Sequence, residues 1–87
     1  MSALATYLDR KNSFAKIFGN SQLSLQNAAD RKKIAQSIDC ELSPENLTCD
    51  GELSRTEVNR RYRALTSAAK ELVKLDPSVA KFMYEFQ

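Results

Sequence analysis

Apolar side chains recur along this chain at spacings of three and four residues, and apolar and polar positions do not alternate over any useful length. The first spacing is typical of helices with one buried face, and strict alternation would be typical of strands. The pattern therefore predicts an all-α fold, a small bundle of four to five short helices around one core, with residues 1–87 forming a single domain.

The N-terminal half of the chain predicts three of these helices. The first runs from about Ala3 to Phe18 within an N-terminal helical extension, residues 1–20, and Gly19 supplies its left-handed cap. Asn12-Ser13 is a point where this helix is expected to fray, because both side chains compete for backbone hydrogen bonds. Its apolar side chains share one broad face: Leu4, Tyr7, Leu8, Phe14 and Phe18.

The second helix covers residues 24–39, with Ser24 as N-cap. It carries a thin apolar stripe of Ala28, Ile34, Ala35 and Ile38. A short helix over residues 43–49 follows, with Ser43 as N-cap and Pro44 in its first turn.

The longest predicted helix covers residues 54–75 and has the clearest start signal. Ser54 is the N-cap and Glu57 stands three residues on, which is the spacing of a capping box. Leu53 and Val58 occupy the two positions of a hydrophobic staple. The apolar face of this helix consists of Val58, Tyr62, Leu65, Ala69 and Leu72.

A terminal helix over residues 77–86 completes the predicted bundle. Asp76 is its N-cap and Pro77 takes the first helical position. Its predicted buried face consists of Val79, Phe82, Met83 and Phe86. Part of this apolar segment could also serve a partner or a homodimer, but packing on its own core is the simpler interpretation.

Composition argues against an enzyme. The chain has no histidine, which removes the commonest general base and metal ligand, and no motif supplies another base to its Ser, Cys or Lys side chains. We therefore expect no catalytic residue, cofactor or metal. Residues 46–57 resemble a degenerate calcium loop, but Asn46 and Thr48 supply too little charge at its first and third positions. A turn at Asp50-Gly51 and the cap of the next helix explain the same residues better.

The chain lacks the pattern of a signal peptide and any apolar run long enough for a membrane span. The sequence therefore predicts a cytoplasmic protein of a bacterium or a phage-infected cell, with no membrane association. In that compartment Cys40 and Cys49 are expected to be reduced thiols.

Charge is segregated along the chain. Residues 39–52 contain five acidic side chains and no basic one, whereas residues 55–74 contain six basic and two acidic side chains. The candidate contacts for a partner or a nucleic acid lie on or beside the polar face of the longest helix: Arg55, Asn59, Arg60, Arg63, Lys70 and Lys74. Arg and Lys serve phosphates, and Arg and Asn also read base edges. A solvated helix face is the simpler alternative.

Several short runs occur in the same order as similar residues in the Hha/YmoA family. They are Gln36-Ser37-Ile38-Asp39, Glu52-Leu53-Ser54 with Glu57, Tyr62-Arg63-Ala64, Glu71-Leu72, Pro77-Ser78-Val79 and Lys81-Phe82. The chain resembles that family from about Leu25 onward and departs from it at Leu65-Thr66-Ser67 and at Ala80. The resemblance implies a small helical cytosolic protein without enzymatic activity, which binds the nucleoid protein H-NS and modulates gene silencing.

Three hypotheses of function follow from the sequence. The first is a non-enzymatic regulatory or adaptor protein that binds a protein partner, such as a nucleoid or transcription protein, through its charged faces. The second is direct nucleic-acid binding by the basic face of the longest helix. The third is a phage or plasmid protein that inhibits a host enzyme.

Overall fold

The computed structural model describes residues 2–19, 22–47 and 54–87. Within these ranges the fold is all-α and contains no strand, which confirms the predicted fold class. The helices are α1 (Ala3–Ile17), α2 (Ala28–Glu41), α3 (Pro44–Leu47) and α4 (Arg55–Leu75). Two 3-10 segments follow, η1 (Pro77–Phe82) and η2 (Tyr84–Phe86). None of the described helices is both long enough and apolar enough to cross a lipid bilayer.

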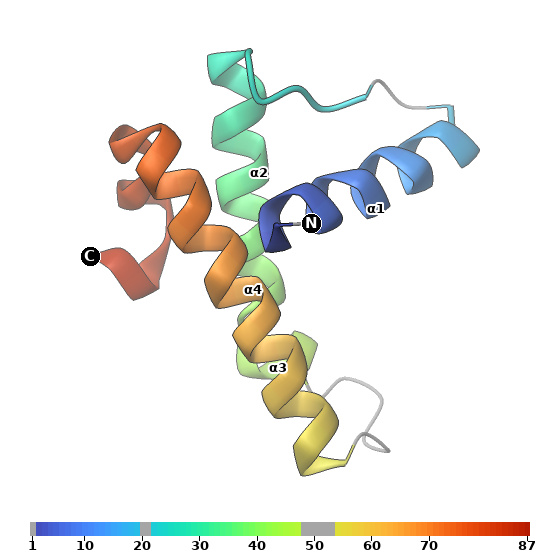
Figure 1. The fold of residues 1–87 in the computed structure, drawn as a ribbon, viewed down its shortest axis with the longest axis vertical. Helices are drawn as coiled ribbons and strands as arrows, with labels where there is room; N and C mark the ends of the chain where they lie inside the picture. The colour runs from blue at the N-terminus through green and yellow to red at the C-terminus, as the bar shows by residue number, and fades with distance from the viewer. Residues whose placement is uncertain (1, 20–21, 48–53) are drawn as a thin grey trace.

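The core lies where α2 and α4 pack together, with α1 crossing α4 on one side and η1 packing against both helices on the other (Figure 1). Ile34, Ile38, Leu72 and Met83 are fully buried there. Ala68 and Ala69 of α4 are fully buried too, and their small side chains let neighbouring elements approach the helix closely.

The observed bounds of α4 coincide with the residues that its capping pattern predicts. Ser54 Oγ accepts a hydrogen bond from the Glu57 amide at 3.2 Å, which caps the first turn. The predicted apolar face needs one correction, because Tyr62 is 39% exposed rather than part of the core. Its hydroxyl reaches across to the Glu85 carboxylate at 3.2 Å.

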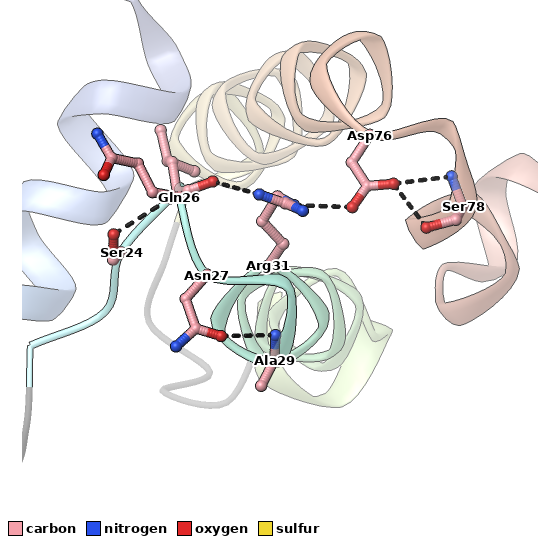
Figure 2. Close-up of polar contacts among 8 residues, drawn as sticks. Ser24, Gln26, Asn27, Ala29, Arg31, Asp76 and Ser78 are labelled. Atoms are coloured by element: carbon pink, nitrogen blue, oxygen red, sulfur yellow. Dashed lines mark hydrogen bonds and ion pairs between the residues drawn. The ribbon is translucent and has the colours of Figure 1, made fainter.

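The start of α2 differs from the sequence prediction. Asn27, not Ser24, is the N-cap, and its side-chain oxygen accepts from the Ala29 amide at 2.9 Å (Figure 2). Ser24 instead closes a turn by accepting from the Gln26 amide at 3.1 Å. Residues 22–24 lead from the far end of α1 toward α2 without regular structure, residues 25 and 26 form a turn, and the helix begins at Ala28 (Figure 1). Ala28 is therefore exposed and does not belong to the buried stripe.

Arg31 joins three parts of the fold (Figure 2). Its Nε lies 2.7 Å from Asp76 Oδ2 at the junction of α4 and η1, and its Nη1 donates to the Leu25 carbonyl at 2.7 Å. Asp76 Oδ1 accepts from the Ser78 hydroxyl at 2.6 Å and from the Ser78 amide at 3.2 Å. The hydrogen bonds from Ser78, and then the one from Arg31, lower the pKa of Asp76.

The terminal segment is also different from the single helix predicted over 77–86. It forms two 3-10 segments separated by Met83, whose backbone is extended at φ −123° and ψ 120°. Met83 and Val79 are buried, while Phe82 and Phe86 are only half-buried. Asp39 Oδ1 accepts from the Tyr84 amide at 2.8 Å and so holds the break against α2. The tighter 3-10 winding and the break at Met83 place the buried side chains of Val79 and Met83 on the core within a short segment.

Part of the sequence prediction falls on residues 48–53, which lie outside the described ranges. These include Cys49 at the end of the predicted short helix, Leu53 of the hydrophobic staple, and half of the candidate calcium loop. The described part of the short helix ends at Leu47.

Candidate functional site

The inner half of α1 belongs to the core. Leu4 and Tyr7 are 3% and 2% exposed, and the Leu4 amide donates to the Glu71 carboxylate of α4. The Tyr7 hydroxyl donates to Ser37 Oγ of α2 at 2.9 Å. Burial, reinforced by the nearby Glu41 carboxylate, raises the pKa of Tyr7. The N-terminal segment is thus an integral part of the fold and not an appendage to it.

The outer half of α1 extends away from the other helices (Figure 1). Phe14, Ile17 and Phe18 are 62%, 77% and 65% exposed there, and the rings of Phe14 and Phe18 contact each other at a tilt of 44°, with centroids 4.7 Å apart. We call these three residues the α1 tip. Phe14 and Phe18 thus belong to the predicted apolar face of α1 but are not buried against the core. Their positions do continue the stripe of Leu4 and Tyr7, but α1 extends beyond the other helices, which therefore do not cover them.

Local contacts hold the outer half of α1 in place. The predicted fraying at Asn12-Ser13 does not occur, and α1 is continuous over Ala3–Ile17, because the Asn12 side chain forms two hydrogen bonds with the backbone of Leu23. Asn12 Oδ1 accepts from the Leu23 amide at 2.7 Å, and Nδ2 donates to the Leu23 carbonyl at 3.2 Å. Gly19 ends the region with a positive φ of 76°, as its predicted role as a left-handed cap requires. The tip is consequently an ordered apolar surface.

A groove of about 700 Å³ lies between the middle of α1, the C-terminal end of α2 and the N-terminal half of α4. Its polar lining is mostly charged, with Arg10, Lys11, Arg60 and Arg61 opposed by Glu41 and Glu57. Lys11 pairs with Glu41 at 3.5 Å, and Arg60 pairs with Glu57. Arg10 and Arg61 form no ion pair with any residue that the structure describes.

All six residues that the sequence suggested as partner contacts are exposed on α4: Arg55, Asn59, Arg60, Arg63, Lys70 and Lys74. Their helical spacing puts Arg63, Lys70 and Lys74 on one strip that faces away from the core, and none of these three forms an ion pair within the described chain. Arg60 lies at the edge of this strip and is shared with the groove. Arg55 and Asn59 lie beside the strip.

A second groove, of about 530 Å³, lies between α3, α4 and the terminal segment. Leu42, Leu47 and Val58 form its apolar floor, and Tyr84 stands 81% exposed at its rim. Sequence reasoning missed both grooves and the α1 tip. The stripe on α1 signalled that Phe14 and Phe18 are apolar contacts, but only the packing shows that the described chain leaves them uncovered.

Cys40 is exposed on α2 as a free thiol, within reach of the Asn46 amide group. In the part of the chain that the structure describes, no three Asp, Glu or Cys side chains gather as metal ligands. The described portion of the candidate calcium loop therefore adds nothing in favour of a metal site.

Comparison with known proteins assigns no family to this chain. No protein-family model matches it, and neither a curated protein nor a solved structure matches it significantly. The resemblance to the Hha/YmoA family stays a prediction from short runs of residues. The geometry of the α1 tip, the grooves and the basic strip carries the functional argument instead.

Proposed function

We propose that this chain is a non-enzymatic regulatory or adaptor protein that binds a protein partner, and that the α1 tip is its main contact. The observation that carries the proposal is the exposure of Phe14, Ile17 and Phe18 together on one ordered helix end. Single exposed apolar residues are ordinary, whereas a contiguous ordered patch beside polar residues is typical of an interaction surface.

The partner class follows from the sequence prediction and not from the patch itself. A nucleoid or transcription protein remains the leading candidate, since the chain resembles the Hha/YmoA family in several runs. A host enzyme inhibited by a phage or plasmid protein is the alternative, and a second copy of the chain would make a homodimer. Each of these partners would use the same apolar tip.

The test is affinity capture from nuclease-treated lysate, comparing wild type with the double variant Phe14→Ser, Phe18→Ser. The variant is expected to capture at least about ten-fold less partner than wild type, since burying one aromatic ring contributes about 1.5–3 kcal/mol. Leu75→Ser is the matched control, because Leu75 is also an exposed apolar side chain, 63% exposed, at the far end of α4. Equal capture by the double variant, or no capture by wild type, would contradict the proposal.

A second candidate function is nucleic-acid binding, and the strip of Arg63, Lys70 and Lys74, which forms no ion pair with a described residue, favours it. Neutralising about three phosphates would give a slope near −3 for log affinity against log salt. Fluorescence anisotropy with a labelled duplex of about 20 base pairs measures this slope. The variant Lys70→Gln, Lys74→Gln should reduce it by about two, while Lys33→Gln on exposed α2 surface serves as the control. A flat salt dependence would exclude this function.

A further inference from the structure

Resting on the proposed function, we infer that the partner presents an acidic amphipathic helix, which lies across the α1 tip and along the groove between α1 and α4. The apolar face of that helix covers Phe14 and Phe18, and its carboxylates meet Arg10 and Arg61. We call the tip and the groove together the docking surface.

The groove begins one helical turn of α1 before the tip. Arg10 lines the groove and stands four residues before Phe14, so the two side chains are neighbours on the same face of α1. Phe18 follows one further turn along this face. A partner that covers the tip therefore also reaches the groove.

The charges of the groove select an acidic partner. Four cations and two carboxylates line it, and the Lys11–Glu41 and Arg60–Glu57 pairs use one cation for each carboxylate. Arg10 and Arg61 remain as exposed guanidinium groups with no ion pair among the described residues. Guanidinium groups bind carboxylates with paired hydrogen bonds, and a basic partner would be repelled.

The size of the tip explains why the groove has to take part. At about 200 Å² for each large apolar side chain, the tip exposes roughly 400 Å². A stable interface needs about 800 Å² from each partner. The tip alone is therefore too small, and the groove of about 700 Å³ that begins at Arg10 adds contact area to it.

A nucleic acid fits this surface less well than an acidic helix does. Only Arg10 and Arg61 in the groove lack an ion pair with a described residue, which is too few cations for a dense row of phosphates, and the aromatic tip would gain nothing from phosphates. The outward strip of α4, where Arg63, Lys70 and Lys74 form no ion pair with a described residue, is the better phosphate surface. The two ligand classes would thus bind to different faces of the molecule.

The test is an NMR titration of the ¹⁵N-labelled full chain with three synthetic peptides of about 18 residues. The first carries leucines on one helical face with flanking glutamates; the second has glutamines in place of the glutamates; the third keeps the glutamates and replaces the leucines with serines. We expect saturable shifts at Arg10, Phe14, Phe18 and Arg61 with the first peptide. The other two should bind at least about ten-fold more weakly, since the second lacks the carboxylates and the third lacks the apolar face.

Charge-reversed variants complete the experiment. Arg10→Glu with Arg61→Glu should weaken the first peptide at least ten-fold, whereas Lys33→Glu, which reverses an exposed charge on α2, should not. Equal binding of the glutamate and glutamine peptides, shifts centred on Lys70 and Lys74, or no saturable binding at millimolar peptide would overturn the inference. The lysate capture separates the two failures: capture that depends on Phe14 and Phe18, but no preference for the acidic peptide, would refute only this inference.

Discussion

At the scale of single residues, Arg31 and Tyr7 fasten segments that lie far apart in the chain. Arg31 connects the return segment before α2 to Asp76, which also caps η1 (Figure 2). Tyr7 connects α1 to Ser37 of α2 from a nearly fully buried position. Because both Asp76 and Tyr7 have shifted pKa values, these two links make stability depend on pH at opposite ends of the scale.

Acid should weaken the Asp76 link. The pKa of Asp76 lies below its ordinary 3.8 in the folded state, so the unfolded chain takes up a proton first as pH falls. Its contribution is complete above about pH 4 and is lost as pH falls through the lowered pKa. Asp76→Asn keeps a capping oxygen. Its free energy of unfolding, measured with urea between about pH 2 and 6, should fall less steeply with decreasing pH than that of wild type. Asp9→Asn, at an exposed carboxylate outside any described ion pair, should retain the wild-type profile.

Alkali should weaken the Tyr7 link. The pKa of Tyr7 is raised above its ordinary 10.0, chiefly by burial, so stability is complete below pH 10 and falls as pH rises further. The loss is at most about 1.4 kcal/mol per pH unit for one proton. Tyr7→Phe should remove this contribution and cost about 1 kcal/mol at neutral pH through the lost hydrogen bond to Ser37. Denaturant unfolding at pH 7 and above pH 10 measures both effects, and an unchanged alkaline slope would contradict the assignment.

At the scale of elements, capping signals were the most informative part of the sequence. Ser54 marks the start of α4, Gly19 ends the α1 region, and Asp76 caps the segment that follows. Where two capping residues lie close together, the sequence cannot choose between them: Ser24 and Asn27 both suit an N-cap, and because residues 25 and 26 form a turn, Asn27 caps the helix. Amphipathic spacing likewise identified the apolar stripe on α1 but not where its covering neighbours end.

Alanine substitutions distinguish the two candidate caps of α2. Asn27→Ala should cost about 1 kcal/mol, because Asn27 accepts the Ala29 amide in the first turn of the helix. Ser24→Ala should cost less than half of that, because Ser24 supports only a turn outside the helix. Urea unfolding of the two variants gives the comparison, and the reverse order of costs would restore Ser24 as the cap.

The two leucines near the end of α4 provide a similar contrast. Leu72 is fully buried and Leu75 is 63% exposed, although they lie only three residues apart. Leu72→Ala should cost about 3 kcal/mol through the cavity it leaves, whereas Leu75→Ala should change stability by less than about 0.5 kcal/mol. Similar losses in both variants would mean that α4 is rotated from the orientation described.

At the scale of the whole molecule, one helix performs two tasks. The inner half of α1 completes the core through Leu4 and Tyr7, and its outer half carries the α1 tip past the edge of the bundle (Figure 1). The all-helical class could be predicted from apolar spacing alone. The docking surface could not, because the groove exists only where α1, α2 and α4 come together and the tip only where α1 extends beyond them, and no spacing within one helix encodes that arrangement.

The most direct test of the central claim is photo-crosslinking in cells with benzoylphenylalanine placed at position 18. The aromatic replacement keeps the apolar character of Phe18, so the proposed contact is preserved. Illumination then crosslinks any bound partner covalently to this position. Benzoylphenylalanine at position 33, on exposed α2 surface, is the matched control. We predict a discrete crosslinked protein from position 18 that position 33 does not give. Identical crosslinking patterns at the two positions, or none at either, would contradict the claim that the α1 tip binds a partner.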